Sequence, residues 1–366
     1  MIHKLFQIIS QRAPHLKFFQ QFRTMILNTF GKLPKGQQRK GLRASPNYSQ
    51  GAFQNLEPTT MMAADASYFK IMRSFFLKQK DTQPKQPLQF SKTDLKAMDK
   101  SLSSIVWFGH SGYFLNLKGL TILVDPVLSG HASPLPGMVK AFPGTDLYQA
   151  EDFPDIDLLV ITHDHYDHLD HHFFSQIRSK VRRVVCSLGV GAHLRHWNLD
   201  AERLTELDWQ ESFETAAFKI TARPGRHFSG RGLIRNQSLW SSFVLKTPDE
   251  KLFLGGDSGY GQHFKTIGDL DGPFDLAILE CGQYNANWPM IHMMPEQTVK
   301  AAKDLKAQVL LPVHWGKFKL ALHPWTEPAE RVLAEANKTG QALIFPAIGE
   351  CFPLTKKTTA YWWRQH

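Results

Sequence analysis

The sequence predicts an α/β fold in which two stacked β-sheets are covered on the outside by helices. From Ser103 onward, short β-type runs are separated by glycine-containing turns, which is typical of successive strands. The continuous apolar run at 156–162 (IDLLVIT) indicates a strand that is buried on both faces. Two series of strands, each followed by helical segments, favour sheets packed face to face. The expected helices cover residues 169–179, about 260–267, 295–306 and 327–338.

Composition excludes several classes of protein. A hydrophobic content of 42% in 366 residues excludes a wholly disordered chain. No stretch approaches 18 consecutive apolar residues, so no transmembrane helix is expected. Cys186, Cys281 and Cys351 are too few and too scattered for a disulfide framework or a cysteine-rich zinc site. Without a clear export signal, we expect a cytoplasmic protein, with a peripheral position on the membrane surface left open.

The net charge of +10 is concentrated in the N-terminal arm. Residues 1–56 contain nine of the 43 Lys and Arg residues and none of the 33 Asp and Glu residues. Phe18, Phe19 and Phe22 recur there at helical spacing, which favours a basic amphipathic helix. We expect residues 1–45 to contact an anionic membrane surface, or else to pack on the body or in a homodimer. The remaining chain is nearly neutral, which argues against nucleic-acid binding.

The domain organisation follows from the change in composition along the chain. Residues 31–60 are rich in Gly, Pro, Gln and Lys and predict an extended linker, and residues 61–100 predict a helical lead-in. We therefore expect two regions. The first, at 1–60, is the basic arm with its linker, and the second, at 61–366, is the main domain with its lead-in.

The segment Thr162–Asp170 (THDHYDHLD) follows the predicted buried strand directly. Alternate residues of an extended stretch point the same way, so His163 and His165 can converge on one ion. Asp167 and His168 then turn toward a second position. Imidazole and carboxylate groups without a thiolate favour Zn²⁺ or a similar borderline metal. The spacing therefore predicts a metal site at the end of this strand.

Three further candidates each follow an apolar run and precede a turn. His227 follows FKITAR, Asp257 follows KLFLGG, and His314 follows AQVLLPV. Each of these residues alone is as typical of a hydrogen-bonded structural residue as of a ligand. Their shared context at predicted strand ends favours a common site with the segment 163–168. We expect Asp164 and Asp170 to act as partners of the ligands or as turn residues.

The order H-x-H-x-D-H, then His, Asp and His resembles the metallo-β-lactamase fold. More narrowly, the chain resembles the phospholipases D that hydrolyse N-acylphosphatidylethanolamine, together with their bacterial relatives. The resemblance implies an αββα sandwich of two mixed sheets, with the hydrolase domain at 61–366. The similar stretches run from about Gly51 to Pro328 and include GAFQN, WFGHSGYFL, ILVDPVLS, THDHYDHLD, GRHFSGRG, SLWSSFVL, LGGDSGYG, GPFDLAILECGQY, IHMMPEQ and PVHWGKFKL.

The resemblance also implies roles for individual residues around two divalent metal ions, with Zn²⁺ favoured. Asp167 and His292 become the candidate catalytic residues, and His292 would protonate the leaving group or bind the phosphate. Met294 departs from the Asp or Asn of many relatives, so the helix at Pro295 lacks a good N-cap. The implied ligands are His163, His165 and His227 for the first ion, Asp167, His168 and His314 for the second, and Asp257 as a bridge.

The function that these observations favour is metal-dependent hydrolysis of a phosphodiester. We expect phospholipase D-type cleavage of N-acylphosphatidylethanolamine to N-acylethanolamine and phosphatidic acid by a hydroxide that two metals activate. Tyr284, Trp288, Met290 and Met294 are candidates for an apolar substrate-binding wall, although they could equally pack the core. The alternatives are a lactonase with the same fold, a scaffold protein with a vestigial site, and a nuclease, which the neutral body disfavours.

Overall fold

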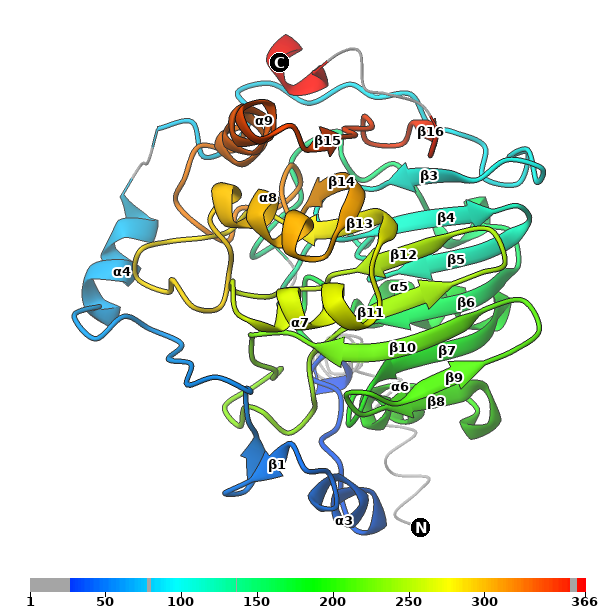
Figure 1. The fold of residues 1–366 in the computed structure, drawn as a ribbon. Coiled ribbons are helices and arrows are strands. Elements are labelled where there is room, and N and C mark those ends of the chain that lie inside the picture. The colour runs from blue at the N-terminus through cyan, green and yellow to red at the C-terminus, as the bar shows by residue number, and fades with distance from the viewer. Residues whose placement is uncertain (1–26, 78–79, 136, 356–360) are drawn as a thin grey trace, which may run out of the picture.

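The computed structural model describes residues 27–77, 80–135, 137–355 and 361–366 (Figure 1). Its centre is a pair of stacked β-sheets, each with seven strands among the described residues. The first sheet has the order β16 (Cys351–Pro353), β3 (Ser104–Trp107), β4 (Tyr113–Leu117), β5 (Leu120–Val124), β6 (Ile156–Ile161), β7 (Val181–Ser187) and β8 (Leu204–Leu207). The second has the order β15 (Ala342–Leu343), β14 (Ala307–Val313), β13 (Phe274–Glu280), β12 (Lys251–Leu254), β11 (Ser241–Lys246), β10 (Lys219–Pro224) and β9 (Ser212–Glu214).

Both sheets are mixed in the same way. Strands β3, β4 and β5 pair antiparallel, and β5 to β8 pair parallel. In the second sheet β9 to β12 pair antiparallel, and β12 to β15 pair parallel. This confirms the predicted α/β sandwich of two mixed sheets.

The apolar core lies between the sheets, and a second apolar layer covers the outer face of the first sheet. In β6, Leu158 and Val160 face the core shared with the second sheet. Leu159 and Ile161 face the opposite way and join the layer that contains Phe173 of α5. The predicted strand at 156–162 is therefore buried on both faces, which explains its continuous apolar sequence.

The helices that the sequence predicts are present on the outside of the sandwich (Figure 1). Helix α5 begins after Asp170, whose Oδ1 accepts hydrogen bonds from His172 N and Phe173 N, as an N-cap does. Before α8, Met294 makes no side-chain cap. The helices are α3 (Gln37–Arg43), α4 (Tyr68–Phe76), α5 (His171–Ile177), α6 (Gly191–His196), α7 (His263–Leu270), α8 (Pro295–Asp304) and α9 (Glu327–Thr339), with 3₁₀ turns η1 (Ala150–Asp152), η2 (Arg178–Lys180), η3 (Ala201–Arg203) and η4 (Trp362–Gln365).

The segment before the sheets differs from its prediction. Residues 31–60 are not an extended linker, because they contain α3 and the hairpin β1 (Tyr48–Ser49) and β2 (Ala52–Phe53). Leu42 and Phe53 are buried against an apolar cluster on the body, and this burial holds the segment in place. Among its described residues, the lead-in at 61–100 is helical only in α4, and residues 80–103 form turns and irregular structure.

The N-terminal amphipathic helix that the sequence predicts falls largely on residues 1–26, which lie outside the described residues. From Leu27 to Ser45 the chain packs on the body. None of the described helices is long and apolar enough to cross a lipid bilayer.

Candidate metal centre

The predicted metal ligands follow the carboxyl ends of four strands. The segment 163–168 follows β6, His227 follows β10, Asp257 follows β12, and His314 follows β14. Strands β12 and β14 both pair in parallel with β13, so their carboxyl ends lie at the same edge of the second sheet. The side chains of all these segments meet in one buried cluster of imidazoles and carboxylates.

Three of the histidines form the first group. His163 Nε2 lies 3.0 Å from His165 Nδ1, and His165 Nδ1 lies 3.3 Å from His227 Nε2. His163 and His227 are each only 1% exposed. Nitrogen atoms this close, from three imidazoles, can share a single metal ion.

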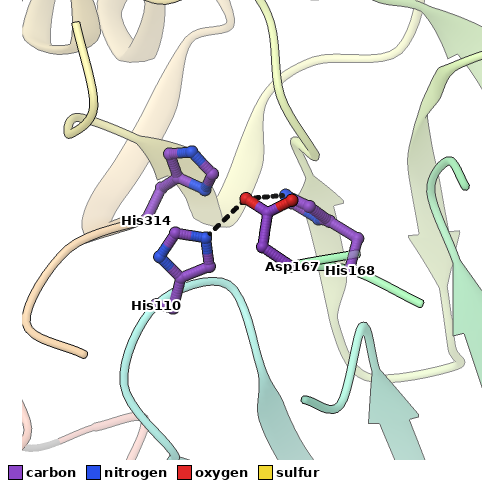
Figure 2. A group of neighbouring side chains, drawn as sticks. All are labelled: His110, Asp167, His168 and His314. Carbon is purple, nitrogen blue, oxygen red and sulfur yellow. Dashed lines mark hydrogen bonds and ion pairs between the residues drawn. The ribbon is translucent and has the colours of Figure 1, made fainter. Parts of the chain in front are cut away.

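The second group contains His110, Asp167, His168 and His314, whose candidate ligand atoms all lie within 4.8 Å of one another. Figure 2 shows the three rings around the carboxylate of Asp167. Asp167 Oδ2 lies 2.9 Å from His110 Nε2 and 3.7 Å from His168 Nε2. His110 comes from the loop after β3, so the first sheet contributes to this group through two separate loops.

Asp257 lies between the two groups, with one carboxylate oxygen toward each. Its Oδ1 is 3.2 Å from His168 Nε2 and 3.1 Å from His314 Nδ1. Its Oδ2 is 3.7 Å from His227 Nε2 and 3.9 Å from His163 Nε2. The carboxylate is thus placed to contact ions in both groups.

The cluster has the properties of a cation site. Among the described residues, Asp257 Oδ1 and His168 Nε2 are buried polar atoms without a hydrogen-bond partner, and they face each other. Burial lowers the pKa of His163, His227 and His314 well below the usual value, so these rings stay neutral, as metal ligands must. A divalent cation would satisfy the orphaned atoms and compensate the buried carboxylates.

His168 differs from these three rings, because its surroundings favour the charged form. Burial disfavours its charged form, but the carboxylates of Asp257, Asp167 and Asp125 raise its pKa well above the usual value. Burial likewise opposes ionisation of Asp257, yet the adjacent His168 holds the pKa of this carboxyl well below its usual range. To bind a metal ion, the ring nitrogen of His168 that faces Asp257 has to be unprotonated.

A layer of hydrogen bonds orients the candidate ligands. His168 Nδ1 lies 2.8 Å from Asp125 Oδ2, so the ring directs Nε2 into the cluster. His227 Nδ1 is 2.8 Å from the backbone oxygen of Ile291, which directs its Nε2 the same way. Asn55 binds both backbone groups of His227, accepting from its N–H at 3.1 Å and donating to its C=O at 2.8 Å.

Asp164 supports the loop after β6 and does not enter either group. Its Oδ1 accepts from Gly230 N at 2.7 Å, and its Oδ2 accepts from Ser238 Oγ at 2.9 Å. His193 Nε2 lies 3.2 Å from the same Oδ2. Because Lys32 N donates to His193 Nδ1 at 3.0 Å, the proton of this ring lies on Nε2 and is donated to Asp164. None of these contacts is with a candidate ligand, so the position of Asp164 fits the second of its two expected roles, that of a turn residue.

Arg231 ties the same loop to the beginning of the described chain. Its side chain is buried, and its Nη1 donates to the carbonyls of Asp164 at 2.8 Å and Leu169 at 2.7 Å. Its Nε and Nη2 donate to the carbonyl of Thr29 at 3.1 and 2.8 Å. The conformation of the loop at 163–168 therefore depends on residues far away in the sequence.

His292 lies beside the cluster and is held by a buried carboxylate. Its Nδ1 is 3.2 Å from Glu280 Oε1, and its ring stacks on that of His314 with 5.1 Å between centroids. Burial raises the pKa of Glu280 to about 7. Burial disfavours the charged form of His292, but the adjacent Glu280 carboxylate raises the pKa of this ring to about 9.

A cavity of about 270 Å³ opens over the cluster. Trp288 lines it, as expected for a substrate-binding residue, but Tyr284, Met290 and Met294 lie outside its lining. Tyr284 instead donates a hydrogen bond to Glu327 at 2.5 Å. The lining consists of Met61, Met62, His165, Asp167, His227, Phe228, Arg235, Asp257, Gln283, Trp288, Ile291, His292, His314 and Leu320.

The sequence did not point to several residues of this site. His110 has no second ligand-type residue near it in the chain, and only its position in a Gly–His–Ser–Gly turn after a strand could have marked it. Asp125 likewise follows β5 directly, in ILVDP. Met61 and Arg235 offer no local signal, because they reach the cavity through the packing of distant segments.

Comparison with known proteins agrees with this geometry. A Beta-lactamase superfamily domain matches residues 121–315. The chain is 39% identical over 328 residues to an uncharacterized protein of Mycobacterium tuberculosis. This alignment covers 87% of this chain and 88% of that protein. It is 31% identical over 245 residues to the N-acyl-phosphatidylethanolamine-hydrolyzing phospholipase D 1 of Caenorhabditis elegans, which covers 62% and 67% respectively.

The solved structures show the same fold. Igni18, a metallo hydrolase from Ignicoccus hospitalis, matches with a TM-score of 0.52 at 20% identity over 68% of this chain and 97% of that chain. The family match, the mixed sandwich and the His/Asp clusters lead to one conclusion. The chain belongs to the β-lactamase superfamily and is a metal-dependent hydrolase.

Proposed function

We propose that the protein is a dinuclear metal-dependent phosphodiesterase that cleaves an N-acylated glycerophospholipid at the bond a phospholipase D cleaves. The observation that carries the proposal is the position of Asp257. One of its oxygens lies 3.1–3.2 Å from His168 and His314, and the other lies 3.7–3.9 Å from His163 and His227. A carboxylate that contacts two ligand groups in this way supports two ions rather than one.

The two ions would be held by the residues that converge on Asp257. Among the described residues no thiol joins either group, and a set of imidazoles and carboxylates favours Zn²⁺. His110 would stay a partner of Asp167, since its Nε2 already contacts that carboxylate. The proposed ligands are His163, His165 and His227 for the first ion, Asp167, His168 and His314 for the second, and Asp257 for both.

The side chains divide the chemical work among them. When bound, two divalent ions lower the pKa of a water molecule and stabilise the charge that develops on the phosphoryl group. Asp257 fixes the spacing of the two groups, and Asp125 fixes the ring of His168. His292 lines the cavity and is placed to donate a proton to the leaving oxygen.

A lipid substrate is supported by the surface around the cavity. Leu233 is fully exposed and Ile234 is 60% exposed, and the next residue, Arg235, lines the cavity. Arg235 also contacts Met61, whose Sδ lies 3.1 Å from its Nη1. Exposed apolar side chains next to a cavity-lining residue would bind the acyl region of a bilayer. The C. elegans relative is named for an N-acylated phospholipid.

Metal analysis tests the dinuclear site. We expect about two equivalents of zinc per chain by elemental analysis of the purified protein, and loss of activity with a chelator that added Zn²⁺ restores. Asp257→Ala should lower the content toward one or none. His172→Ala, which removes an exposed histidine from α5, should leave the content unchanged. One equivalent in the unaltered protein would contradict the dinuclear assignment.

Product analysis tests the substrate. We expect N-acylphosphatidylethanolamine to yield N-acylethanolamine and phosphatidic acid in a mass spectrum. Diacylglycerol and a phosphorylated N-acylethanolamine would show cleavage of the other phosphoester bond. Turnover of lactones without turnover of any phosphodiester would contradict the proposal and favour the lactonase alternative.

A further inference from the structure

Glu280 is the most deeply buried carboxylate near the cavity that the proposed metal site does not use. It ends β13, between the strands that carry Asp257 and His314, and its side chain is fully buried. Among the described residues its Oε2 has no hydrogen-bond partner. Burying a carboxyl group away from water costs free energy unless its contacts compensate for the lost hydration. The contacts of Glu280 should therefore show what this side chain does.

All three contacts of the Glu280 side chain converge on Oε1. It accepts from Ser258 N at 3.2 Å, from Met293 N at 3.1 Å, and from His292 Nδ1 at 3.2 Å. Ser258 follows Asp257 and Met293 follows His292, so one oxygen atom joins the β12 loop to the loop before α8. The donors are two backbone amides and one ring, and only the ring reaches the cavity.

The contact with Glu280 determines which ring nitrogen of His292 faces the cavity. Because Nδ1 is paired with the carboxylate, the proton of Nδ1 is held there and Nε2 is the free nitrogen. The ring is stacked against His314 at 5.1 Å and packs edge-on against His227 at 5.1 Å. These contacts therefore fix the orientation of the His292 ring, with Nδ1 toward Glu280.

We propose that Glu280 is a positioning residue that holds His292 with Nε2 directed at the substrate bound over the metal cluster. This inference rests on the proposed function, because it assigns His292 to the same reaction. Glu280 itself does not contact the cavity. Its effect on the reaction passes through the His292 ring, whose Nδ1 lies 3.2 Å from Glu280 Oε1.

The first experiment compares Glu280→Gln and Glu280→Leu in the zinc-loaded protein with N-acylphosphatidylethanolamine in detergent micelles. Glutamine keeps an oxygen that can accept from His292, and leucine does not. We expect kcat to fall by about 10-fold in the glutamine variant and about 10²-fold in the leucine variant, with little change in KM, which is the scale of losing general acid–base help.

The double variants separate positioning from a general structural role. In a His292→Ala background, Glu280→Gln and Glu280→Leu should cost almost nothing further, since the ring through which they act is gone. Asp208→Asn removes the charge of another buried carboxylate, which neither lines the cavity nor belongs to the cluster, and should leave kcat unchanged. Equal losses in both backgrounds, or a lower zinc content in Glu280→Gln, would overturn the inference.

A measurement without substrate keeps this test independent of the proposed function. The measurement is an NMR spectrum of the imidazole ¹⁵N nuclei in the zinc-loaded protein. The signals of His292 are assigned as those that are missing in the spectrum of His292→Ala. We expect Nδ1 to be protonated in the unaltered protein and to lose this proton in part of the molecules in Glu280→Leu. Identical spectra would overturn the inference. Failure to hydrolyse any phosphodiester, with the expected spectra, would contradict the proposed function alone.

Discussion

The floor and the mouth of the cavity differ in burial and in the number of contacts that hold their side chains. We call the metal cluster the floor: His227, Asp257 and His314 line the cavity, and His163 and His168 belong to the same cluster outside its lining. These side chains are almost completely buried, and each imidazole is held by a further hydrogen bond. We call the mouth Met61, Arg235 and Trp288, which line the cavity, together with Leu233 and Ile234, which precede Arg235 in the chain. It includes a fully exposed apolar side chain, Leu233.

This difference separates chemistry from substrate choice. A buried, over-determined floor gives the preorganised charges that a metal-assisted hydrolysis needs. An exposed apolar mouth on loops can change between relatives without disturbing the floor. Changes in the floor should therefore affect every substrate, and changes at the mouth should affect only substrates presented in a membrane.

The largest effect is expected for Asp257→Asn. Loss of the charge between the two ligand groups should reduce kcat by about 10³-fold or more on both micellar and soluble phosphodiesters, since a central electrostatic group is removed. Metal content should fall in parallel, as elemental analysis would show. Full metal content with normal activity would show that Asp257 does not link the two groups.

A smaller effect of the same kind is expected for Asp125→Asn. The amide would still contact His168 Nδ1 but would no longer hold its proton as a carboxylate does. Metal affinity should fall by about 10–100-fold, the range typical of such partners. Competition with a chromogenic chelator measures the affinity. Asp155→Asn, at an exposed position directly before β6, is the control.

The mouth is tested by Leu233→Ser combined with Ile234→Ser. Each side chain contributes about 1.5 kcal/mol or more on entering a bilayer, so vesicle binding of the double variant should weaken about 10²-fold or more. Hydrolysis of a short, soluble phosphodiester should stay unchanged. Leu270→Ser, at an exposed position on α7, serves as the control. Equal loss on vesicles and on the soluble substrate would break the distinction between floor and mouth.

The smallest effect concerns the loss of folding stability at acid pH, for which we consider His263. His263 lies 3.1 Å from Ser258 Oγ, and burial lowers its pKa from 6.5 to about 3. The unfolded state takes up this proton below pH 6.5 and the folded state does not, so stability is lost as the pH falls from 6.5 toward 3. His263→Gln should flatten this part of the pH dependence of Tm. An unchanged slope would show that His263 is not its source.

The sequence predicted the floor far better than the mouth, and the reason is physical. Four of the candidate ligands lie within six residues, at 163–168, directly after a strand whose apolar run marks its burial. His227, Asp257 and His314 also follow strands, so the fold class was enough to bring them together. That they bind metal stays a prediction that the proposed metal analysis tests.

Contacts between distant segments could not be read in the same way. Glu280 ends a strand and contacts His292 in the loop that follows, and Met61 reaches Arg235 across 174 residues of the chain. The linker prediction for 31–60 was wrong because its polar composition hides the two apolar anchors, Leu42 and Phe53. A few buried side chains outweighed the average character of the segment.

The buried guanidinium of Arg231 connects the start of the described chain to the loop that carries four of the candidate metal ligands. It donates to Thr29 on one side and to Asp164 and Leu169 on the other. A shortened protein that begins after Lys32 would leave two of its donors without acceptors in a dry interior. The opening segment and the ligand loop should accordingly gain or lose hydrogen-exchange protection together, as a single cooperative unit.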